Sequence, residues 1–351
     1  MKICLATYPA VTLTGGGPFI KIEEIKKQLE LLGHRVDFFD MWNLEQRITD
    51  YDIVHLVGAN FAVFGLARTL KEAKINYLLE PVFFSNHSSK FIKRINSIDK
   101  HIRKLARGIW SDYGIIRDIC SWSEMVLPNT NSEAEILSVG LSIPKEKFHV
   151  IPNGVSERFL SGDPGIFKNK FGINNFILYV GHLGFKRKNG LALVKALKKI
   201  NHPAVIIGNI ADAGEREEIL SEIKNNKNII LIDPLKNSDP LLASAYAACD
   251  TFVLPSQFET PGIAALEAGL AGAKIVITPF GGTKEYFKDM AEYPDVFSIE
   301  SIKDSIERSL NKHKDEKLRD HIKSNFLWSK IAGQTSEVYV DIKNKLRATN
   351  K

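Results

Sequence analysis

Cysteine is scarce in this chain of 351 residues, and its scarcity narrows the kinds of site that the protein can carry. The three cysteines, Cys4, Cys120 and Cys249, stand far apart, each beside apolar neighbours. This pattern predicts buried thiols in a reducing compartment and excludes a disulfide framework or a cysteine metal cluster. The nine histidines also lack the spacing of metal ligands. We therefore expect a cytoplasmic protein that binds no metal.

Long apolar runs are absent as well. No segment approaches the roughly 18–20 consecutive apolar residues that a membrane-spanning helix needs. The first residues lead directly into a strand-like segment and lack the layout of a secretory signal. The chain also has no solenoid-length repeat and no low-complexity tract. Its formal net charge of +6 is moderate, so the location of the positive charge matters more than its total.

Short apolar segments alternate with helical patterns through both halves of the chain. We predict ten strands, at residues 2–6, 36–39, 53–56, 77–84 and 125–127 in the first half and 176–180, 204–207, 229–232, 251–254 and 274–278 in the second. Several are continuous apolar runs, which indicates parallel strands buried on both faces. The alternation predicts an α/β fold with two doubly wound, Rossmann-like domains.

The expected domains are residues 1–155, residues 156–325, and a C-terminal helix, 326–351, that crosses back to the first domain. The polar, turn-rich stretch 155–175 reads as the linker. Open α/β sheets bind ligands at the carboxyl ends of their strands. Two such domains facing across a cleft would therefore carry their chemistry on strand-to-helix loops.

Three such loops stand out. Gly15-Gly16-Gly17-Pro18 follows the first predicted strand and precedes a helix that we expect to begin near Phe19. Glycines let backbone N–H groups approach an anion closely, and a helix N-terminus adds partial positive charge. The run is not a G-x-G-x-x-G motif, and a simple turn would also explain it.

The second loop, VGHLGFKRKNG, follows the first strand of the second half and holds Lys186, Arg187 and Lys188. Three basic residues between a strand and a helix could neutralise a diphosphate. The alternative is a solvated basic loop, but the glycines on either side favour a binding loop.

The third loop, FETPGIAALEAG, places Glu259 and Glu267 eight residues apart, around an expected helix start at Pro261-Gly262. If all eight residues were helical, the two carboxylates would be about 12 Å apart along the axis. The catalytic carboxylates of glycoside hydrolases lie roughly 5–9.5 Å apart, so the spacing suits a long ligand held at both ends. Glu267 lies among Ala and Leu, where an unpaired carboxylate would be costly.

These pieces resemble the large family of retaining GT-B glycosyltransferases with the E-x7-E motif, glycosyl transferases group 1 or family 4. The matching segments follow in the family's order: GGGPF, LLGHRVDFF, DIVHLVG, VIPNGVSERF, VGHLGFKRKNG and PSQFETPGIAALEAGLAGAKIVITPFGGTKE.

The resemblance implies a role for each matching residue. Glu259 would contact the donor sugar, Glu267 the nucleotide ribose, and Lys188 the departing diphosphate. The predicted catalytic residues are Lys188, Glu259, His87 and His182, and the predicted donor-binding residues are Gly16, Gly17, Arg187, Thr260, Pro261, Gly262, Ile263 and Glu267, with Gly281, Gly282 and Glu285 as supporting residues. His87, in FFSNHSSK, matches a histidine beside the transferred sugar.

Two positions depart from the family. His182 stands where arginine is usual, and Pro261 stands where an aromatic residue is more common. Arginine is always charged, whereas histidine is largely neutral at pH 7, so the grip on the leaving group could be weaker here. Asp50-Tyr51-Asp52 has the form of a D-x-D metal motif, but it precedes a predicted strand and so lies at the wrong end for a site.

The resemblance implies a retaining, metal-independent transferase with no cofactor. It would move a sugar from a nucleotide-diphosphate sugar, UDP in preference to GDP, to a lipid-linked or polysaccharide acceptor. Two alternatives remain open at this point: a non-catalytic nucleotide-sugar-binding protein, which the histidine at 182 would favour, and a phosphorylase-like enzyme on the same fold.

One further segment, Lys90 to Trp110, has a basic amphipathic pattern. Its apolar residues recur at helical spacing: Phe91, Ile95, Ile98, Ile102, Leu105 and Ile109. Its basic residues are Lys90, Lys93, Arg94, Lys100, Arg103, Lys104 and Arg107, and Asp99 is its one acid. Such a helix could lie on an anionic membrane at the inner face of the cell, or pack its apolar face on the core. Nucleic acid is not expected, because the aromatics form no stacking platform.

Overall fold

The computed structural model describes residues 1–14, 16–105, 108–212 and 214–349. Two compact units divide the chain: the first comprises Met1–Asn153 with Trp328–Lys351, and the second Gly154–Leu327. The C-terminal helix α15 (Trp328–Thr349) thus belongs to the first unit, while the chain between its two segments forms the second. Gly15 and Arg107, both named from the sequence, lie outside the described residues.

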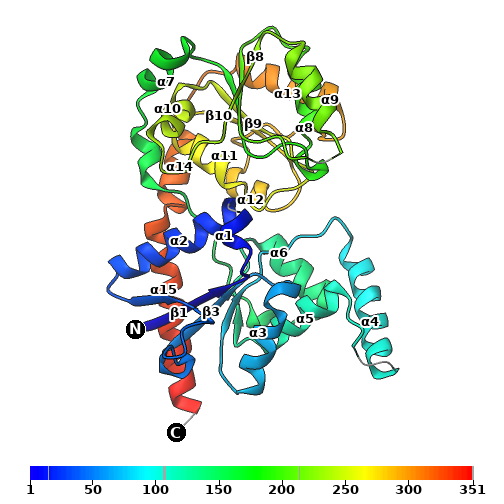
Figure 1. The fold of residues 1–351 in the computed structure, drawn as a ribbon, viewed down its shortest axis with the longest axis vertical. Helices are drawn as coiled ribbons and strands as arrows, with labels where there is room; N and C mark the ends of the chain where they lie inside the picture. The colour runs from blue at the N-terminus through cyan, green and yellow to red at the C-terminus, as the bar shows by residue number, and fades with distance from the viewer. Residues whose placement is uncertain (15, 106–107, 213, 350–351) are drawn as a thin grey trace. The chain divides into compact units, whose positions relative to one another are not determined.

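The first unit is built on a five-stranded parallel sheet in the order β2-β1-β3-β4-β5 (Figure 1). The strands are β1 (Lys2–Thr7), β2 (Arg35–Phe38), β3 (Ile53–Val57), β4 (Leu78–Glu80) and β5 (Met125–Val126). In the register, Ile3 of β1 lies opposite Val36 on one side and Ile53 on the other. All five strands predicted for this half are present.

Side chains alternate along β1, so apolar side chains point to both faces of this sheet. Helices cover both faces. Ile3 and Leu5 pack in one apolar cluster with α2 (Gly16–Leu31) and α15. Cys4 and Ala6 pack in another with α3 (Phe61–Glu72) and α5 (Asp112–Trp122). The unit also contains α1 (Val11–Thr14), α4 (Ser89–Leu105), α6 (Asn131–Glu135) and the short turns η1 (Ile48–Asp50), η2 (Ile136–Gly140) and η3 (Lys145–Lys147).

The second unit repeats the plan with the strand order β10-β9-β6-β7-β8, again all parallel. Its strands are β6 (Ile177–Val180), β7 (Ala204–Ile207), β8 (Ile229–Ile232), β9 (Thr251–Leu254) and β10 (Lys274–Ile277). Its helices are α7 (Pro164–Phe171), α8 (Gly190–Leu197), α9 (Arg216–Lys224), α10 (Pro240–Ala248), α11 (Ile263–Leu270), α12 (Thr283–Phe287), α13 (Ile299–Asn311) and α14 (Lys317–Asn325). In Figure 1, α8, α9 and α13 lie on one side of this sheet and α10, α11 and α14 on the other.

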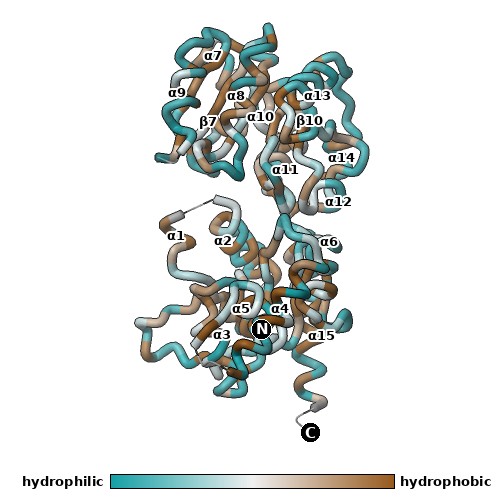
Figure 2. Tube along the Cα trace, turned by 90° about the vertical axis from the view of Figure 1, so that its right-hand side faces the viewer, coloured by the Kyte–Doolittle hydropathy of each residue, from teal (hydrophilic) through white to brown (hydrophobic). Residues whose placement is uncertain are grey.

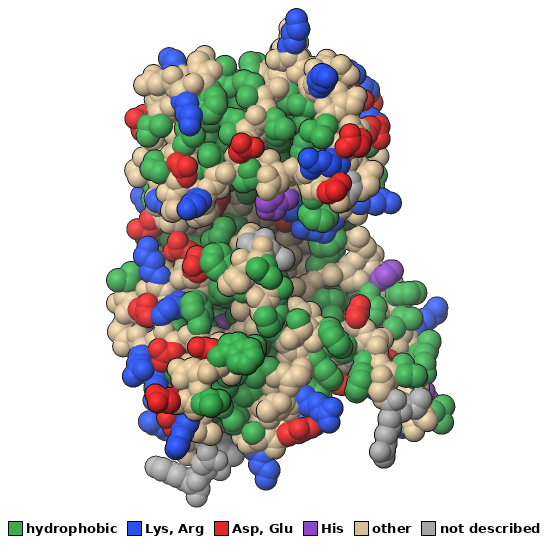
Figure 3. All heavy atoms as spheres, viewed as in Figure 1, with side chains coloured by type: hydrophobic (Ala, Val, Ile, Leu, Met, Phe, Trp, Pro, Cys, Tyr) green, Lys and Arg blue, Asp and Glu red, His purple; other side chains and the backbone are tan. Residues whose placement is uncertain are grey.

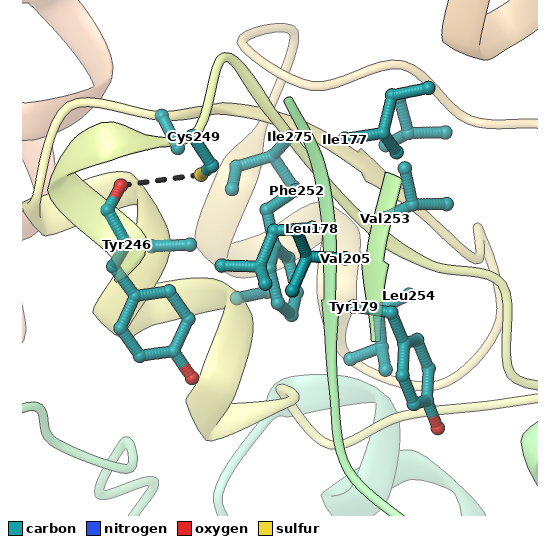
Figure 4. Close-up of a cluster of buried hydrophobic side chains, with 14 of the residues drawn as sticks. Ile177, Leu178, Tyr179, Val205, Tyr246, Cys249, Phe252, Val253, Leu254 and Ile275 are labelled. Carbon is teal, nitrogen blue, oxygen red and sulfur yellow. Dashed lines mark hydrogen bonds between the residues drawn. The ribbon is translucent and has the colours of Figure 1, made fainter. Parts of the chain in front are cut away.

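The core of the second unit is a single large apolar cluster centred on the strands. Leu178, Val205 and Phe252 come from three neighbouring strands and pack beside Tyr246 of α10 (Figure 4). Hydrophobic segments run through the interior of each unit, and hydrophilic ones lie along its outer turns (Figure 2). The expectation that Cys4, Cys120 and Cys249 are buried free thiols is confirmed.

Two predicted boundaries were wrong. The strand expected over 77–84 ends at Glu80, because Pro81 has no N–H for the ladder and Val82 has a φ of +50°. The stretch 155–175, expected as a linker, is an integral part of the second unit. It forms η4 (Glu157–Ser161) and α7, and Phe159 and Phe167 within it are fully buried.

Within the part of the chain that the structure describes, no helix is both long enough and apolar enough to cross a membrane.

Candidate functional site

Three loops meet at the carboxyl end of the second unit's sheet. The loops that follow β6 and β9 are joined by a hydrogen bond from Gln257 N to Arg187 O (2.8 Å). The loops that follow β9 and β10 are joined through Glu259, whose N donates to Phe280 O (3.1 Å) and whose O accepts from Gly282 N (3.0 Å). The first loop of this trio carries the predicted basic residues, and the second carries the predicted glutamate.

Glu259 is the centre of this cluster. Its side chain is nearly buried, and its Oε1 lies 2.6 Å from Lys188 Nζ and 3.4 Å from Arg187 Nη1. Burial alone would raise the pKa of the Glu259 carboxyl, but the charges of Lys188 and Arg187, with the hydrogen bond from Lys188, hold it below its ordinary value. The carboxylate is therefore ionised and fixed in orientation.

The three basic residues form η5 (Lys186–Lys188), a tight 3₁₀ turn. Neighbouring side chains on such a turn point in different directions. Lys188 and Arg187 reach Glu259, whereas Lys186 is exposed. Arg187 is held further by its bond to Phe258 O (3.2 Å) and by the Phe258 ring, 5.1 Å from the guanidinium carbon.

Glycine is required on both sides of the glutamate. Gly281 has a φ of +91°, and a Cβ there would lie 2.0 Å from Glu259 O. Gly262 has a φ of +85°, and a Cβ would lie 2.8 Å from Leu254 Cδ2. Any side chain at either position would therefore displace the loop that holds Glu259.

The helix between the two glutamates begins later than we predicted. The Thr260–Pro261 peptide is cis, and α11 begins at Ile263, after Gly262. The segment is thus a turn followed by a helix, so the separation of about 12 Å estimated for eight helical residues does not apply.

Glu267 accepts hydrogen bonds from two neutral side chains. Tyr246 donates its hydroxyl to Glu267 Oε2 (2.8 Å), and Asn237 Nδ2 donates to Oε1 (2.7 Å). Arg158 Nη2 in turn donates to Asn237 Oδ1 (2.8 Å). Burial and the nearby Glu267 carboxylate raise the pKa of Tyr246 well above its ordinary value, so its hydroxyl remains a donor. We did not predict Asn237 or Tyr246, and the one signal was a lone tyrosine in the otherwise small and apolar helix LLASAYAA.

His182 lies on the same β6 loop but is exposed. Its backbone O accepts from Tyr179 OH at 3.4 Å, and Glu259 pairs with Lys188 and Arg187. Gly184, two residues on, has a φ of +93°, and a Cβ there would lie 2.5 Å from Ala211 O. The backbone of this loop is therefore fixed by glycine, while the imidazole stays at the surface.

Glu285 lies in α12 of the second unit, and His87, Gly16 and Gly17 belong to the first unit. His87 follows β4, its Nδ1 lies 2.8 Å from Tyr113 OH, and its ring centroid lies 4.5 Å from that of Phe91. Gly16 and Gly17 form the first turn of α2, so the helix begins earlier than the expected position near Phe19. The positions and contacts of His87, Gly16 and Gly17 all lie within the first unit.

The D-x-D motif has a structural role. Asp52 accepts from Lys2 N (2.9 Å) and pairs with Lys343 (2.8 Å), both within the first unit. Among the described residues, no group of three or more His, Cys, Asp or Glu side chains could hold a metal ion.

Two doubly wound units, each with a parallel five-stranded sheet, define an α/β protein of the GT-B class. Two family models match the chain: glycosyl transferases group 1 over residues 166–326, and glycosyltransferase family 4 over residues 16–159. The chain belongs to this glycosyltransferase family, as the motifs predicted.

Individual relatives agree with this assignment. An uncharacterized glycosyltransferase of Methanocaldococcus jannaschii is 26% identical over 343 residues, which cover 90% of this chain and 78% of that protein. Glycogen synthase of Moorella thermoacetica is 32% identical over 125 residues, covering 31% of this chain and 26% of that enzyme.

Solved structures show the same fold. Sucrose-phosphate synthase from Thermosynechococcus elongatus superposes with a TM-score of 0.76 at 16% identity, covering 97% of this chain and 99% of that one. Anabaena HepE, in complex with UDP and glucose, superposes with a TM-score of 0.70 at 15% identity, covering 96% and 99%.

Proposed function

We propose that this glycosyltransferase is retaining and metal-independent, and that it moves a sugar from a nucleotide-diphosphate sugar to a lipid-linked or polysaccharide acceptor. The observation that carries the proposal is the cluster of Glu259, Lys188 and Arg187 at the carboxyl edge of the second sheet. UDP is the proposed nucleotide of the donor, in preference to GDP. The similar HepE structure contains UDP, and this supports the choice of UDP in the proposal.

Lys188 and Arg187 are suited to stabilise a departing diphosphate. An ammonium group has three donors, and a guanidinium has five, so each can hold Glu259 and a phosphate oxygen together. The N-terminus of α11, which begins four residues after Glu259, adds partial positive charge at the same edge. Charge fixed in advance lowers a barrier when negative charge grows in the transition state.

The two glutamates would hold opposite ends of the donor. Glu259, kept ionised by its cations, would accept hydrogen bonds from sugar hydroxyls. Glu267, fixed by Tyr246 and Asn237, would accept from the ribose. Because Glu259 is already paired with two cations, it is a poor nucleophile, which favours attack by the acceptor from the face of the leaving phosphate.

The first test is thermal shift with UDP, GDP and ADP and their sugar conjugates, each with and without EDTA. A ligand at 100 times its Kd stabilises the folded protein by about 2.7 kcal/mol. We expect UDP compounds to raise the Tm equally with and without EDTA. A shift that EDTA abolishes would contradict the metal-independent site, and no shift with any nucleotide would contradict donor binding.

One alternative is a protein that binds nucleotide sugar without turnover. The exposed His182 is the observation that favours it. Product analysis separates the cases. Sugar transferred to an acceptor with its anomeric configuration retained supports the proposal. Sugar phosphate as the main product would instead support a phosphorylase-like enzyme, and binding without any product would support the binder.

A further inference from the structure

Helix α4 (Ser89–Leu105) is turned the opposite way from an ordinary surface helix. The core-facing interpretation of its sequence predicted that the apolar stripe packs inward. The structure instead buries Ile92, Asn96 and Asp99. The helix also ends at Leu105, so Ile109 and Trp110 follow it instead of extending its apolar face as we expected.

A polar network fixes this orientation. Asp99 Oδ1 accepts from both Ser111 N and Ser111 Oγ (each 2.8 Å), and Asp99 Oδ2 pairs with Arg103 Nε (2.8 Å). Arg117 of α5 donates to Asn96 Oδ1 (2.6 Å) and lies 3.3 Å from Asp99 Oδ2. Burial would raise the pKa of Asp99, but Ser111, Arg103 and Arg117 hold it below its ordinary value. Rotating the helix to bury its apolar face would separate these charged groups from their partners.

Close packing beneath the helix supports the same orientation. Gly114 of α5 lies directly against the network, and a Cβ there would lie 2.3 Å from Asp99 Oδ2. The polar face of α4 is therefore seated as closely on α5 as the backbone allows.

The outward consequence is an exposed apolar face. Phe91, Ile98, Ile102 and Leu105 are 43%, 54%, 38% and 89% exposed. At 3.6 residues per turn, these four lie within about 60° of the helix circumference. Hydrophobic side chains are visible over α4 in Figure 3. We call these four residues the α4 apolar face.

Positive charge lies on one side of this face. At 3.6 residues per turn, Arg94 and Lys90 lie about 50° and about 90° from its centre, and Lys93, Lys100 and Lys104 lie at least about 130° away. All five are exposed, and the one acid of the helix, Asp99, is buried. The bordering charge is therefore not neutralised from within the helix. A second copy of this chain would bring like charges together around the two apolar faces, which disfavours self-association.

We propose that the α4 apolar face and its basic border dock on an anionic lipid surface. The four apolar side chains would enter the region between headgroups and acyl chains, and Arg94 and Lys90 would lie beside lipid phosphates. Because His87 stacks on Phe91 at the start of the helix, docking would hold the loop that carries His87 next to the lipid surface. The docking itself does not depend on the proposed function.

Vesicle sedimentation of the full chain tests this, using vesicles of phosphatidylcholine alone and of phosphatidylcholine and phosphatidylglycerol in equal parts. We expect binding to the mixed vesicles only, weakened by salt. Each basic residue near an anionic surface strengthens binding by about fivefold, so the pair Lys90→Gln/Arg94→Gln should weaken it by about 30-fold. Ile98→Gln/Leu105→Gln should weaken it by at least about tenfold.

Matched variants elsewhere in the chain serve as controls. Lys168→Gln/Lys170→Gln removes two exposed charges from α7, and Trp42→Ser/Leu44→Ser removes two side chains that are 86% and 93% exposed. Both should bind mixed vesicles like the parent. Binding to neutral vesicles alone, no binding to either vesicle, or equal loss in the control pairs would overturn the proposal. So would a lipid-free dimer, seen by sedimentation velocity, that Ile98→Gln/Leu105→Gln dissociates. Nucleotide thermal shifts, measured in parallel, report failure of the donor site separately.

Discussion

The two units each bury a glutamate near the end of their sheets, and the two carboxylates have opposite environments. Glu259 in the second unit contacts Lys188 and Arg187, and its pKa is held below the ordinary value. Glu133 in the first unit accepts from the backbone N–H groups of Phe83 (2.6 Å) and Asn129 (2.7 Å). Burial raises the pKa of Glu133 to about 7, although those two hydrogen bonds lower it.

The partners explain the difference. In the first unit, Lys21 forms its ion pair with Glu80 and donates to Asn129 Oδ1 (2.5 Å), and Glu80 raises the pKa of Glu133. That network ties together the loops after β4 and β5. In the second unit, the cations lie on a partly exposed turn, where a ligand can share them. A buried carboxylate at a sheet edge therefore indicates a ligand site only when its cationic partners remain accessible.

The largest expected effect is on turnover in the second unit. Lys188→Ala should lower kcat by about 10²–10³-fold, because it removes a charge placed where the leaving diphosphate develops its own. Steady-state kinetics with the donor found by thermal shift measure this. Lys186→Ala is the matched control, since it removes the same charge from the exposed position two residues earlier. Equal losses in both variants would mean that overall charge, not the contact with Glu259, matters.

The next effect is on the stability of the first unit. The folded state holds the Glu133 proton more tightly than the unfolded chain, so the free energy of unfolding should fall as pH rises from about 4.5 to about 7. The loss should be about 3 kcal/mol. Glu133→Gln should remove this pH dependence. Glu259 should act in the opposite sense, its contribution being lost as pH falls below the ordinary range of a glutamate.

Tryptophan fluorescence in urea can follow the first unit alone. All four tryptophans, Trp42, Trp110, Trp122 and Trp328, lie in that unit. A profile that stays flat between pH 5 and 7 in the parent chain would contradict the assignment of a raised pKa to Glu133.

A smaller effect is expected on donor affinity. Tyr246→Phe removes one of the donors that hold Glu267, and a hydrogen bond to a charged group contributes about 1.5–3 kcal/mol. We expect nucleotide affinity to fall by about tenfold or more, measured by calorimetry. Tyr77→Phe is the control, because its buried hydroxyl donates to Ile119 O (2.7 Å) in the first unit. It should reduce stability and leave nucleotide affinity unchanged.

The sequence predicted the strands well because their signal is local. Short apolar segments located all ten, and β4 was overextended only because Pro81 and the positive φ of Val82 stop a pattern that remains apolar. The stretch 155–175 was wrongly predicted as a linker because its average composition is polar, although Phe159 of η4 and Phe167 of α7 are buried in the core. Composition reports the average of a segment, while burial depends on single residues.

The candidate site was predictable where a motif supplies both partners. Lys188 and Glu259 stand in separate motifs, and the structure joins them. Asn237 was not predictable, because its contact with Glu267 spans 30 positions and its loop has no pattern. The orientation of α4 was left open for a related reason: periodicity identifies an apolar face, but the network around Asp99 decides which face is buried.

The smallest expected effect concerns His182, which lies on the site's first loop without contacting Glu259 through any described interaction. An imidazole is largely neutral near pH 7, whereas a guanidinium is charged and can bind phosphate through two parallel hydrogen bonds. His182→Arg should therefore raise kcat by a few fold, about 1 kcal/mol at a partly exposed position. It should leave the Tm without ligand unchanged, because the side chain is at the surface.

His182→Gln, which carries no charge, is the control and should match the parent near pH 7. If the arginine variant were also unchanged, Lys188 and Arg187 would suffice for the leaving group, and the departure from the family at this position would have no catalytic consequence. If activity appeared only in the arginine variant, the parent chain would be a donor-binding protein that one substitution converts into an enzyme.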